Sequence, residues 1–319
     1  MTYDITSYGE IGLRLSPAGG RSLARTELLS VNVIGTEFNV MANLASLGWK
    51  TALLSAVPDT PLGEKARSTV RQLGVADDWI NSTDEEQRIG IYFVDYGVSP
   101  KPTSVYFDRK GTAFTLWRPS QKELDSILDT KVLHLSGLSL ALSDLVADVS
   151  MQLLTQAKAR STTVSFDLNH RRKLWAADRA AKVSLPFIEQ ADVLIAPNSD
   201  VNELFDRSAD ASENLDYLGG ISGASVIAVT DGERGAVARI GDQVLAAPAA
   251  EVEIVDRLGA GDGFASGLLH ALISQRPELA LISGTHFAAL ALAQQGEQVS
   301  IQLGIFEQIL TGNAGRLQR

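Results

Sequence analysis

Short apolar runs alternate with longer amphipathic segments over most of this chain of 319 residues. The run Val193–Ala196 is apolar throughout, which is typical of a parallel strand covered on both faces. The pattern predicts strands over Asp4–Tyr8, Thr51–Ala56, Val132–Ser136, Thr163–Asp167, Val193–Ala196 and Val226–Thr230, with helices over Thr36–Leu47, Leu62–Leu73, Ser143–Ala159 and Ala177–Gln190. This alternation indicates an α/β fold with a central, mostly parallel sheet flanked by helices.

Three further runs look like strands that no helix separates: Ile11–Ser16, Ile89–Asp95 and Ser104–Phe107. We interpret them as a small β element that projects from the α/β body as a lid, with strands contributed from about 11–31 and 89–117. These spans are too short and interrupted for an independent domain. Because 45% of the residues are hydrophobic, the chain can bury one large core, and we expect a single domain over 1–319.

The segment Val255–Gly267 contains the strongest chemical pattern, a glycine-rich turn that leads into the amphipathic stretch Phe264–Ile273. Glycines allow a ligand to approach the backbone, and the free N–H groups of a helix N-terminus favour an anion such as phosphate. The spacing is G-x-G-x-G, unlike the G-x-G-x-x-G of a dinucleotide-binding loop. No Gly-Lys-Ser/Thr follows, so the segment is not a P-loop either.

Asp262 is the unusual member of this turn. A carboxylate at a helix N-terminus is ordinarily a cap, which is the structural interpretation. In a loop that holds phosphate, however, a fixed negative charge repels the ligand unless it faces another substrate. A carboxylate aimed at an alcohol can accept the hydroxyl proton as a γ-phosphoryl group transfers, while nearby N–H groups stabilise the phosphate. The functional interpretation is therefore a catalytic base.

Composition excludes several other classes of protein. The formal net charge is −10 and the sequence pI is about 4.9, which argues against a nucleic-acid partner. The N-terminus lacks the features of a signal peptide, and no apolar run approaches the ~20 residues of a membrane helix, so we expect no membrane partner. Cys is absent, which excludes disulfides and Cys-based zinc sites and suits a reducing cytoplasm, the expected location. The four His residues lack paired metal spacing, and no metal ligand is assigned.

Several segments together resemble one known family. They are Asp256–Asp262, Gly35–Val40 followed by Ala45-x-x-Gly48, Val57–Gly63, Gly9–Ile11 with Leu13–Pro17, and Ser165–Trp175. The first is similar to the C-terminal signature of the ribokinase-like (PfkB) carbohydrate kinases. The last two resemble the 2-keto-3-deoxygluconate kinase branch of that family, and the likeness extends over nearly the whole chain.

The resemblance implies a ribokinase-like fold with a small β-sheet lid over the sugar, ATP with Mg²⁺, and phosphorylation of the primary hydroxyl of a sugar. It implies a catalytic centre of Asp262 with Gly259, Ala260 and Gly261. Substrate contacts are implied for Gly35, Asn39, Tyr92, Phe107, Arg109, Arg171 and Asp262, and ATP contacts for Asn198, Thr230, Gly232, Gly235, Gly259 and Gly261. A homo-oligomer formed through the lid sheet is a further expectation from the family.

Two arginines suggest the class of substrate. Arg171 follows a predicted strand of the central sheet and Arg109 follows a predicted lid strand. Each could be an ordinary solvated charge. If both reach the pocket, they can pair with the carboxylate of a sugar acid. The leading hypothesis is phosphorylation of 2-keto-3-deoxygluconate to its 6-phosphate.

Three positions depart from the family pattern. Val201 replaces the Glu of the N-x-x-E motif that begins at Asn198, Phe107 stands where the branch often has Tyr, and Ile34 replaces a second glycine. Two alternatives therefore stay open: a fructokinase or another ribokinase-like sugar kinase, and a catalytically silent sugar-binding regulator on the same fold.

Overall fold

The computed structural model describes residues 1–17, 21–97 and 102–312. Its larger sheet has nine strands in the order β13-β12-β11-β10-β9-β8-β1-β4-β5. Pairing is parallel from β11 to β5, whereas β12 and β13 add an antiparallel hairpin at one edge. The strands span β1 Tyr3–Tyr8, β4 Thr51–Pro58, β5 Ile80–Thr83, β8 Thr130–Ser136, β9 Thr163–Asp167, β10 Val193–Pro197, β11 Val226–Thr230, β12 Ala236–Ile240 and β13 Gln243–Ala247. The predicted α/β fold is confirmed.

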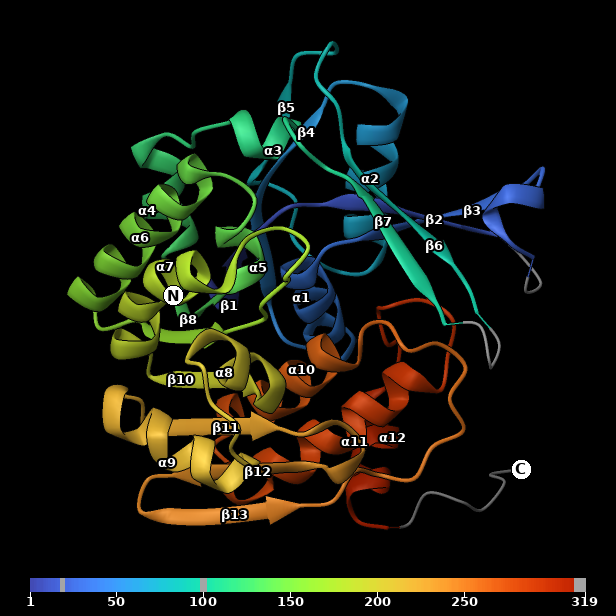
Figure 1. Cartoon of the computed structure of the whole chain (residues 1–319). Helices are drawn as coiled ribbons and strands as arrows, with labels where there is room; N and C mark the ends of the chain where they lie inside the picture. The colour runs from blue at the N-terminus through green and yellow to red at the C-terminus, as the bar shows by residue number, and fades with distance from the viewer. Residues whose placement is uncertain (18–20, 98–101, 313–319) are drawn as a thin grey trace.

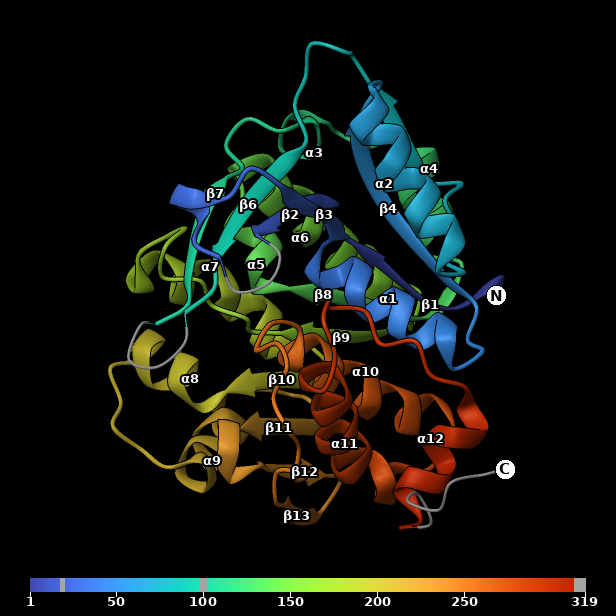
Figure 2. The ribbon, with the colours of Figure 1, turned by 90° about the vertical axis from the view of Figure 1, so that its right-hand side faces the viewer.

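Helices cover both faces of this sheet (Figures 1 and 2). One layer contains α3 Ala113–Leu116, α4 Gln121–Ile127, α5 Gly137–Leu140, α6 Asp144–Ala159, α7 Ala177–Gln190, α8 Asn198–Leu204 and α9 Ala211–Ile221. The opposite layer contains α1 Thr36–Ser46, α2 Pro61–Gln72, α10 Ala260–Ile273 and α11 Ala280–Leu292, against which α12 Leu303–Leu310 packs. Among the described residues, no helix is both long and apolar enough to cross a membrane.

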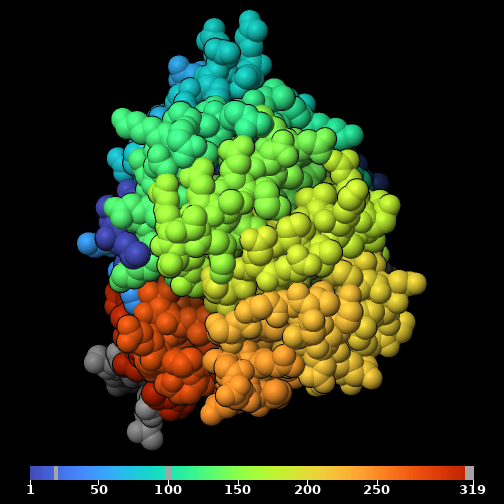
Figure 3. Space-filling model, turned by 90° about the vertical axis from the view of Figure 1, so that its left-hand side faces the viewer, coloured from blue at the N-terminus to red at the C-terminus, as the bar shows by residue number. Residues whose placement is uncertain are grey.

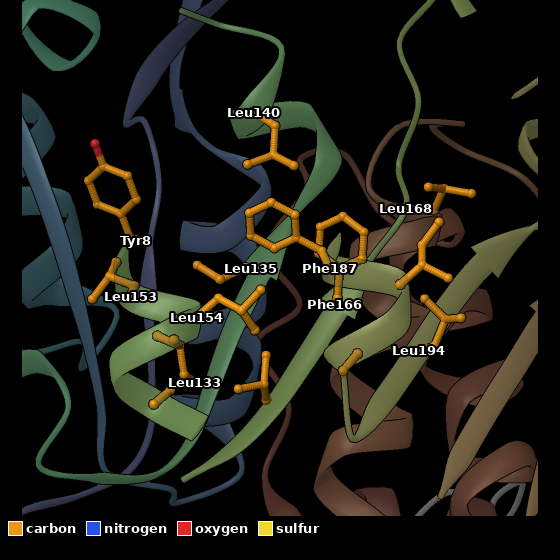
Figure 4. Close-up of a cluster of buried hydrophobic side chains, with 14 of the residues drawn as sticks. Tyr8, Leu133, Leu135, Leu140, Leu153, Leu154, Phe166, Leu168, Phe187 and Leu194 are labelled. Carbon is orange, nitrogen blue, oxygen red and sulfur yellow. The ribbon is translucent and has the colours of Figure 1, made fainter. Parts of the chain in front are cut away.

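The core under the first layer is an aromatic and aliphatic cluster (Figure 4). Phe166 on β9 stacks on Phe187 of α7, with their ring centroids 5.2 Å apart. The ring centroids of Tyr8 and Phe114 are 4.9 Å apart. Full burial of side chains of this size stabilises a fold by about 1.5–3 kcal/mol each. Figure 3 shows the outer side of this layer, where the green and yellow middle of the chain forms a continuous surface.

A separate sheet of four strands, ordered β3-β2-β6-β7, projects to the right in Figure 1. Its strands are β2 Gly12–Pro17, β3 Leu29–Ile34, β6 Gly90–Asp95 and β7 Ser104–Asp108. The hydrophobic pattern predicted three of them but missed β3, which is exposed over much of its length and extends past residue 31. Leu29 and Val31 are exposed on β3. Assembly through this sheet stays a prediction.

Close contact between α10 and α11 fixes the helix that carries the glycine turn. Gly267 faces α11 so closely that an added Cβ would lie 2.2 Å from Ser283 O and 2.8 Å from Phe287 Cβ. Only a residue without a side chain lets the two helices approach to this distance. Gly267 thereby fixes where α10, and the turn at its start, lies against the rest of the layer.

We predict that Gly267→Ala lowers the free energy of unfolding by about 1–3 kcal/mol, because overpacking outweighs the better helix propensity of Ala. Gly220→Ala in α9 is the matched control, since nothing lies within 4 Å of its Cβ position. That control should be neutral or stabilising by up to about 1 kcal/mol. Urea unfolding measures both, and equal effects of the two substitutions would contradict the packing argument.

Candidate active site

The N-termini of α1 and α10 meet near the carboxyl ends of the central strands. Asn39 of α1 donates a hydrogen bond from Nδ2 to Asp262 Oδ2 of α10 at 2.6 Å. Asp167 ends β9 and Arg171 follows it, and both carry charges that act on Asp262. In open α/β sheets, ligands bind outside this edge of the sheet. The structure thus brings together four residues that come from three separate parts of the sequence.

The start of α10 presents backbone N–H groups to solvent. Gly259 precedes the helix in the left-handed region, with φ 89°. The first helical hydrogen bond runs from Gly263 N to Gly259 O at 2.8 Å, so the N–H groups of Ala260, Gly261 and Asp262 have no partner within the helix. Gly261 is exposed and nothing lies within 4 Å of its Cβ position. This N-terminus can therefore receive an anion such as phosphate.

Asp262 does not cap its own helix. It lies in the first turn, yet no side chain caps α10, and its carboxylate faces Asn39. Asp262 is 6% exposed, and burial raises its pKa well above the usual value. The hydrogen bond from Asn39 opposes this shift and the negative charge of Glu297 adds to it. A carboxyl group held in this way can accept a proton nearer to neutral pH than an exposed Asp.

The smaller sheet contacts the same turn through aromatic side chains. Tyr92 on β6 and Phe107 on β7 are paired across the strands, with ring centroids 6.0 Å apart. They belong to one apolar cluster with Leu258, the residue before Gly259. The sheet thus lies beside the start of α10, where a lid over a sugar is expected.

Gly35 precedes α1 and allows a close approach between backbone segments. An added Cβ at Gly35 would lie 2.3 Å from Glu10 O, in the link between β1 and β2. Packing alone therefore requires a glycine at this position. A contact between Gly35 and substrate stays a prediction.

The two arginines singled out from the sequence differ in the structure. Arg109 donates from Nε and Nη2 to Glu10 Oε2 at 2.9 and 2.5 Å. Its side chain is only 10% exposed. Arg171 is exposed, and among the described residues no carboxylate forms an ion pair with it. Its charge nevertheless lowers the pKa values of nearby carboxyl groups, including that of Asp262. Arg171 is thus the arginine available to a ligand.

The positions expected at the nucleotide gather at the ends of β10 and β11. Thr230 pairs with Pro197, and Asn198 begins the helix that follows. The turn after Thr230 contains Gly232 and Gly235 at φ 58° and 94°, a region that favours glycine. The same turn leads into the antiparallel hairpin of β12 and β13. The structure brings these residues together, whereas their contact with ATP stays a prediction.

Sequence reasoning missed a set of carboxyl groups around the site. Glu10, Glu37, Asp167 and Glu297 are buried, and Asp200 is half-buried. Glu37 accepts hydrogen bonds from Ser136 and Ser139, each at 2.6 Å, and burial raises its pKa. The signal was present, because Glu37 interrupts an otherwise buried helix and Asp167 ends an apolar strand. Nothing in the pattern marked Glu297, which lies in the loop between α11 and α12.

Residues 4–303 match the pfkB family carbohydrate kinase profile. The chain belongs to this family. It is therefore an enzyme that transfers a phosphoryl group from ATP to a carbohydrate, and the resemblance inferred from the sequence is confirmed. The cytoplasmic location stays a prediction.

Several known proteins are similar to this carbohydrate kinase over nearly its whole length. It is 33% identical to a 2-dehydro-3-deoxygalactonokinase of Haloferax volcanii over 320 residues, covering 100% of both chains. A 2-dehydro-3-deoxygluconokinase from Thermotoga maritima has a similar structure, with a TM-score of 0.90, 28% identity and coverage of 98% of this chain and 99% of the other. A candidate Ribokinase II from E. coli, solved with ATP and Mg²⁺, superposes with a TM-score of 0.86 at 20% identity, covering 97% and 99%. This last likeness concerns the fold alone.

Protein ligands for a resident metal do not gather in the described part of the chain, where no three His, Cys, Asp or Glu residues lie close enough to hold one. Val201, in the family's Glu position, is buried in the hydrophobic core. Asn198 instead is held by Asn214, whose Nδ2 donates to Asn198 Oδ1 at 2.6 Å.

Asp167 gives a pH dependence to stability. Burial raises the pKa of Asp167 to about 7, the charge of Asp200 adds to this shift and that of Arg171 opposes it. Because the folded pKa exceeds the unfolded one, this group stabilises the fold most below about pH 4. Its contribution is lost as the pH rises through about 7.

We predict that Asp167→Asn changes the free energy of unfolding differently at the two sides of this pKa. The change should be about 1–3 kcal/mol more stabilising at pH 8 than at pH 5, because Asn cannot ionise.

Urea unfolding at the two pH values measures this difference. Asp242→Asn is the control, because Asp242 is exposed in the hairpin turn. Its effect should be the same at both pH values. An Asp167→Asn effect that also did not change with pH would contradict a raised pKa for the buried Asp167 carboxyl group.

Proposed function

We propose that this kinase phosphorylates the primary hydroxyl of a 2-keto-3-deoxy sugar acid, most specifically 2-keto-3-deoxygluconate, giving the 6-phosphate. The observation that carries the proposal is the buried Asp262 carboxylate beside the free N–H groups of α10. The names of the relatives add the substrate class, since one acts on the galacto form and the other on the gluco form. These two acids differ in configuration at C4 and share a carboxylate, a keto group and a primary hydroxyl.

In this mechanism Asp262 accepts the proton of the sugar's primary hydroxyl as its oxygen forms a bond to the γ-phosphorus of ATP. The bond between that phosphorus and the bridging oxygen breaks, and ADP leaves. The N–H groups of Ala260 and Gly261 stabilise the charge on the migrating group. Mg²⁺, when bound to the phosphates, would offset their negative charge. Asn39 holds the carboxylate in place through its hydrogen bond to Asp262.

We propose that ATP binds beside this centre. The carboxyl ends of β10 and β11 place Asn198 and Thr230 next to each other. The turn over Gly232–Arg234 is exposed there, and an added Cβ at Gly232 would meet no neighbouring group within 4 Å. We assign the nucleotide to this region, with its γ-phosphate directed to the start of α10.

Arg171 is proposed to bind the carboxylate of the sugar acid. It is exposed near the carboxyl ends of the strands, and its guanidinium can form two parallel hydrogen bonds to a carboxylate. Arg109 has already paired with Glu10, and this observation favours the second candidate function, a kinase of neutral sugars such as a fructokinase. A catalytically silent regulator has the Val201 substitution in its favour. The free N–H groups of α10 beside the Asp262 carboxylate argue against the regulator, because a protein that only binds sugar does not need a base.

Removal of the base should separate binding from chemistry. We predict that Asp262→Asn reduces kcat by a factor of ~10²–10⁴, because the amide cannot accept the proton. Sugar and ATP affinities should change only a few-fold, as measured by calorimetry with a hydrolysis-resistant ATP analogue. Near-normal turnover in an ADP-release assay would remove Asp262 from the role of base.

A substrate panel tests the specificity. The panel contains 2-keto-3-deoxygluconate, its C4 epimer 2-keto-3-deoxygalactonate, and fructose, with identification of the phosphorylated product. We predict that the two acids are used far better than fructose. Arg171→Ala should raise KM for the acids by about 10–100-fold, equivalent to about 1.4–2.7 kcal/mol, with little change for fructose.

The matched control is Arg172→Ala, because Arg172 is the exposed neighbour that pairs with Glu203. It should leave KM for all three sugars within a few-fold of the parent. Preferred use of fructose by the parent enzyme would favour the second candidate function. Turnover of none of the sugars, together with sugar-dependent thermal stabilisation, would favour the regulator.

A further inference from the structure

A second carboxylate, Glu297, lies behind the glycine turn. It comes from the loop between α11 and α12 and is only 7% exposed. A Cβ added to Gly259 would lie 3.0 Å from Glu297 Cα and 3.1 Å from Glu297 O, so the two backbones are in close contact. Phosphoryl transfer with Asp262 as base does not require another acid here. Its burial is costly without partners, which makes the contacts of Glu297 informative.

The Glu297 carboxylate has partners on both sides. Asn39 Nδ2 donates to Glu297 Oε2 at 3.0 Å. On the other side, the hydroxyl of Tyr92 and Nη1 of Arg14, the latter at 3.3 Å, donate to Glu297 Oε1. Arg14 stands on β2 and Tyr92 on β6, both in the smaller sheet. Glu297 therefore bridges the lid and the helix that carries Asn39.

The amide of Asn39 is shared between the two carboxylates. Its Nδ2 donates to Asp262 at 2.6 Å as well as to Glu297, and so uses both hydrogens. Its Oδ1 accepts from Gln298 Nε2 at 2.6 Å, which fixes the orientation of the amide. Gln298 is itself held by Val33 O at 2.9 Å. These hydrogen bonds fix the orientation of the Asn39 amide, which donates one hydrogen to Asp262 and the other to Glu297.

Charge in this region is only partly balanced. Arg14 is fully buried and pairs with both Asp256, at 2.9 Å, and Glu297. One cation thus faces two carboxylates before Asp262 is counted. Charged and titratable groups surround both Asp262 and Glu297. Those that face Asp262 are Glu297, Arg171 and Asp167. Those on the lid side of Glu297 are Arg14, Tyr92, Asp256 and Tyr96. Burial disfavours ionisation of Asp262, and the negative charge of Glu297 adds to this effect.

We propose that Glu297 is a positioning residue for phosphoryl transfer, which acts through the shared amide of Asn39 to hold the Asp262 carboxylate and to tie it to Arg14 and Tyr92 of the lid. This inference rests on the proposed role of Asp262 as base. Glu297 does not touch the reacting atoms. It fixes the orientation of the group that does and adds to its proton affinity.

The substitution Glu297→Gln tests this role. Glutamine keeps the size of the side chain but replaces one carboxylate oxygen with an NH₂ group. That NH₂ group would face either the Asn39 amide or the Arg14 and Tyr92 donors, so one of these hydrogen bonds would be lost. We predict a fall in kcat of about 10-fold from the loss of positioning. The acid limb of the profile of kcat/KM against pH should move to lower pH by roughly one unit, because a neighbouring negative charge has been removed.

Controls separate this role from a structural one. Glu278→Gln, at an exposed position before α11, should leave kcat and the pH profile unchanged. Glu297→Asp keeps the charge but shortens the side chain, so kcat should fall while the acid limb stays near that of the parent. That variant also decides the question if Glu297→Gln does not fold, because a parent-like kcat in Glu297→Asp would overturn the proposal.

The two hypotheses can fail separately. If Asp262→Asn abolishes turnover but Glu297→Gln leaves the acid limb unmoved, the positioning role is wrong and the base assignment stands. If Asp262→Asn turns over normally, the proposed function itself fails. A Glu297→Gln enzyme with lowered thermal stability, an unmoved acid limb and an unchanged kcat per folded molecule would show a merely structural residue.

Discussion

The hydrogen bond from Asn39 to Asp262 is the contact on which this active site depends. A carboxylate in the first turn of a helix is drawn to the free N–H groups beside it, where it would act as a cap. Asn39 directs it elsewhere and leaves those N–H groups without a protein anion. One short segment can then present a proton acceptor and a phosphate cradle side by side. The chain belongs to a family of carbohydrate kinases, and this arrangement suits the transfer of a phosphoryl group to a sugar.

The rest of the fold positions these two helices. The nine-stranded sheet carries α1 and α10 on the same face, where their apolar residues share one core cluster. Gly267 lets α11 approach α10 closely, and the loop after α11 returns to place Glu297 behind Gly259. The smaller sheet adds Tyr92 from the other side. The site therefore depends on contacts between segments that are far apart in the sequence.

Local patterns were enough to predict most of the α/β body and the glycine turn. Apolar strands such as Val193–Pro197 form as expected, because their signals depend on neighbouring residues. The strand β3 was missed because Leu29–Val31 are exposed and lack the alternation of a half-buried strand. Sequence also placed Asn39, Asp262 and Arg171 in one site, through the family resemblance. It could not show that Arg109 is held by Glu10, since this pairing depends on tertiary structure.

The central claim is that the Asp262 carboxylate faces the hydroxyl that receives the phosphoryl group. A crystal structure with a 2-keto-3-deoxy sugar acid and a hydrolysis-resistant ATP analogue measures this directly. The account predicts an Asp262 oxygen within about 2.6–3.2 Å of the primary hydroxyl oxygen, with the γ-phosphate at the start of α10. A complex in which another side chain contacts that hydroxyl, while Asp262 remains hydrogen-bonded only to Asn39, would contradict it.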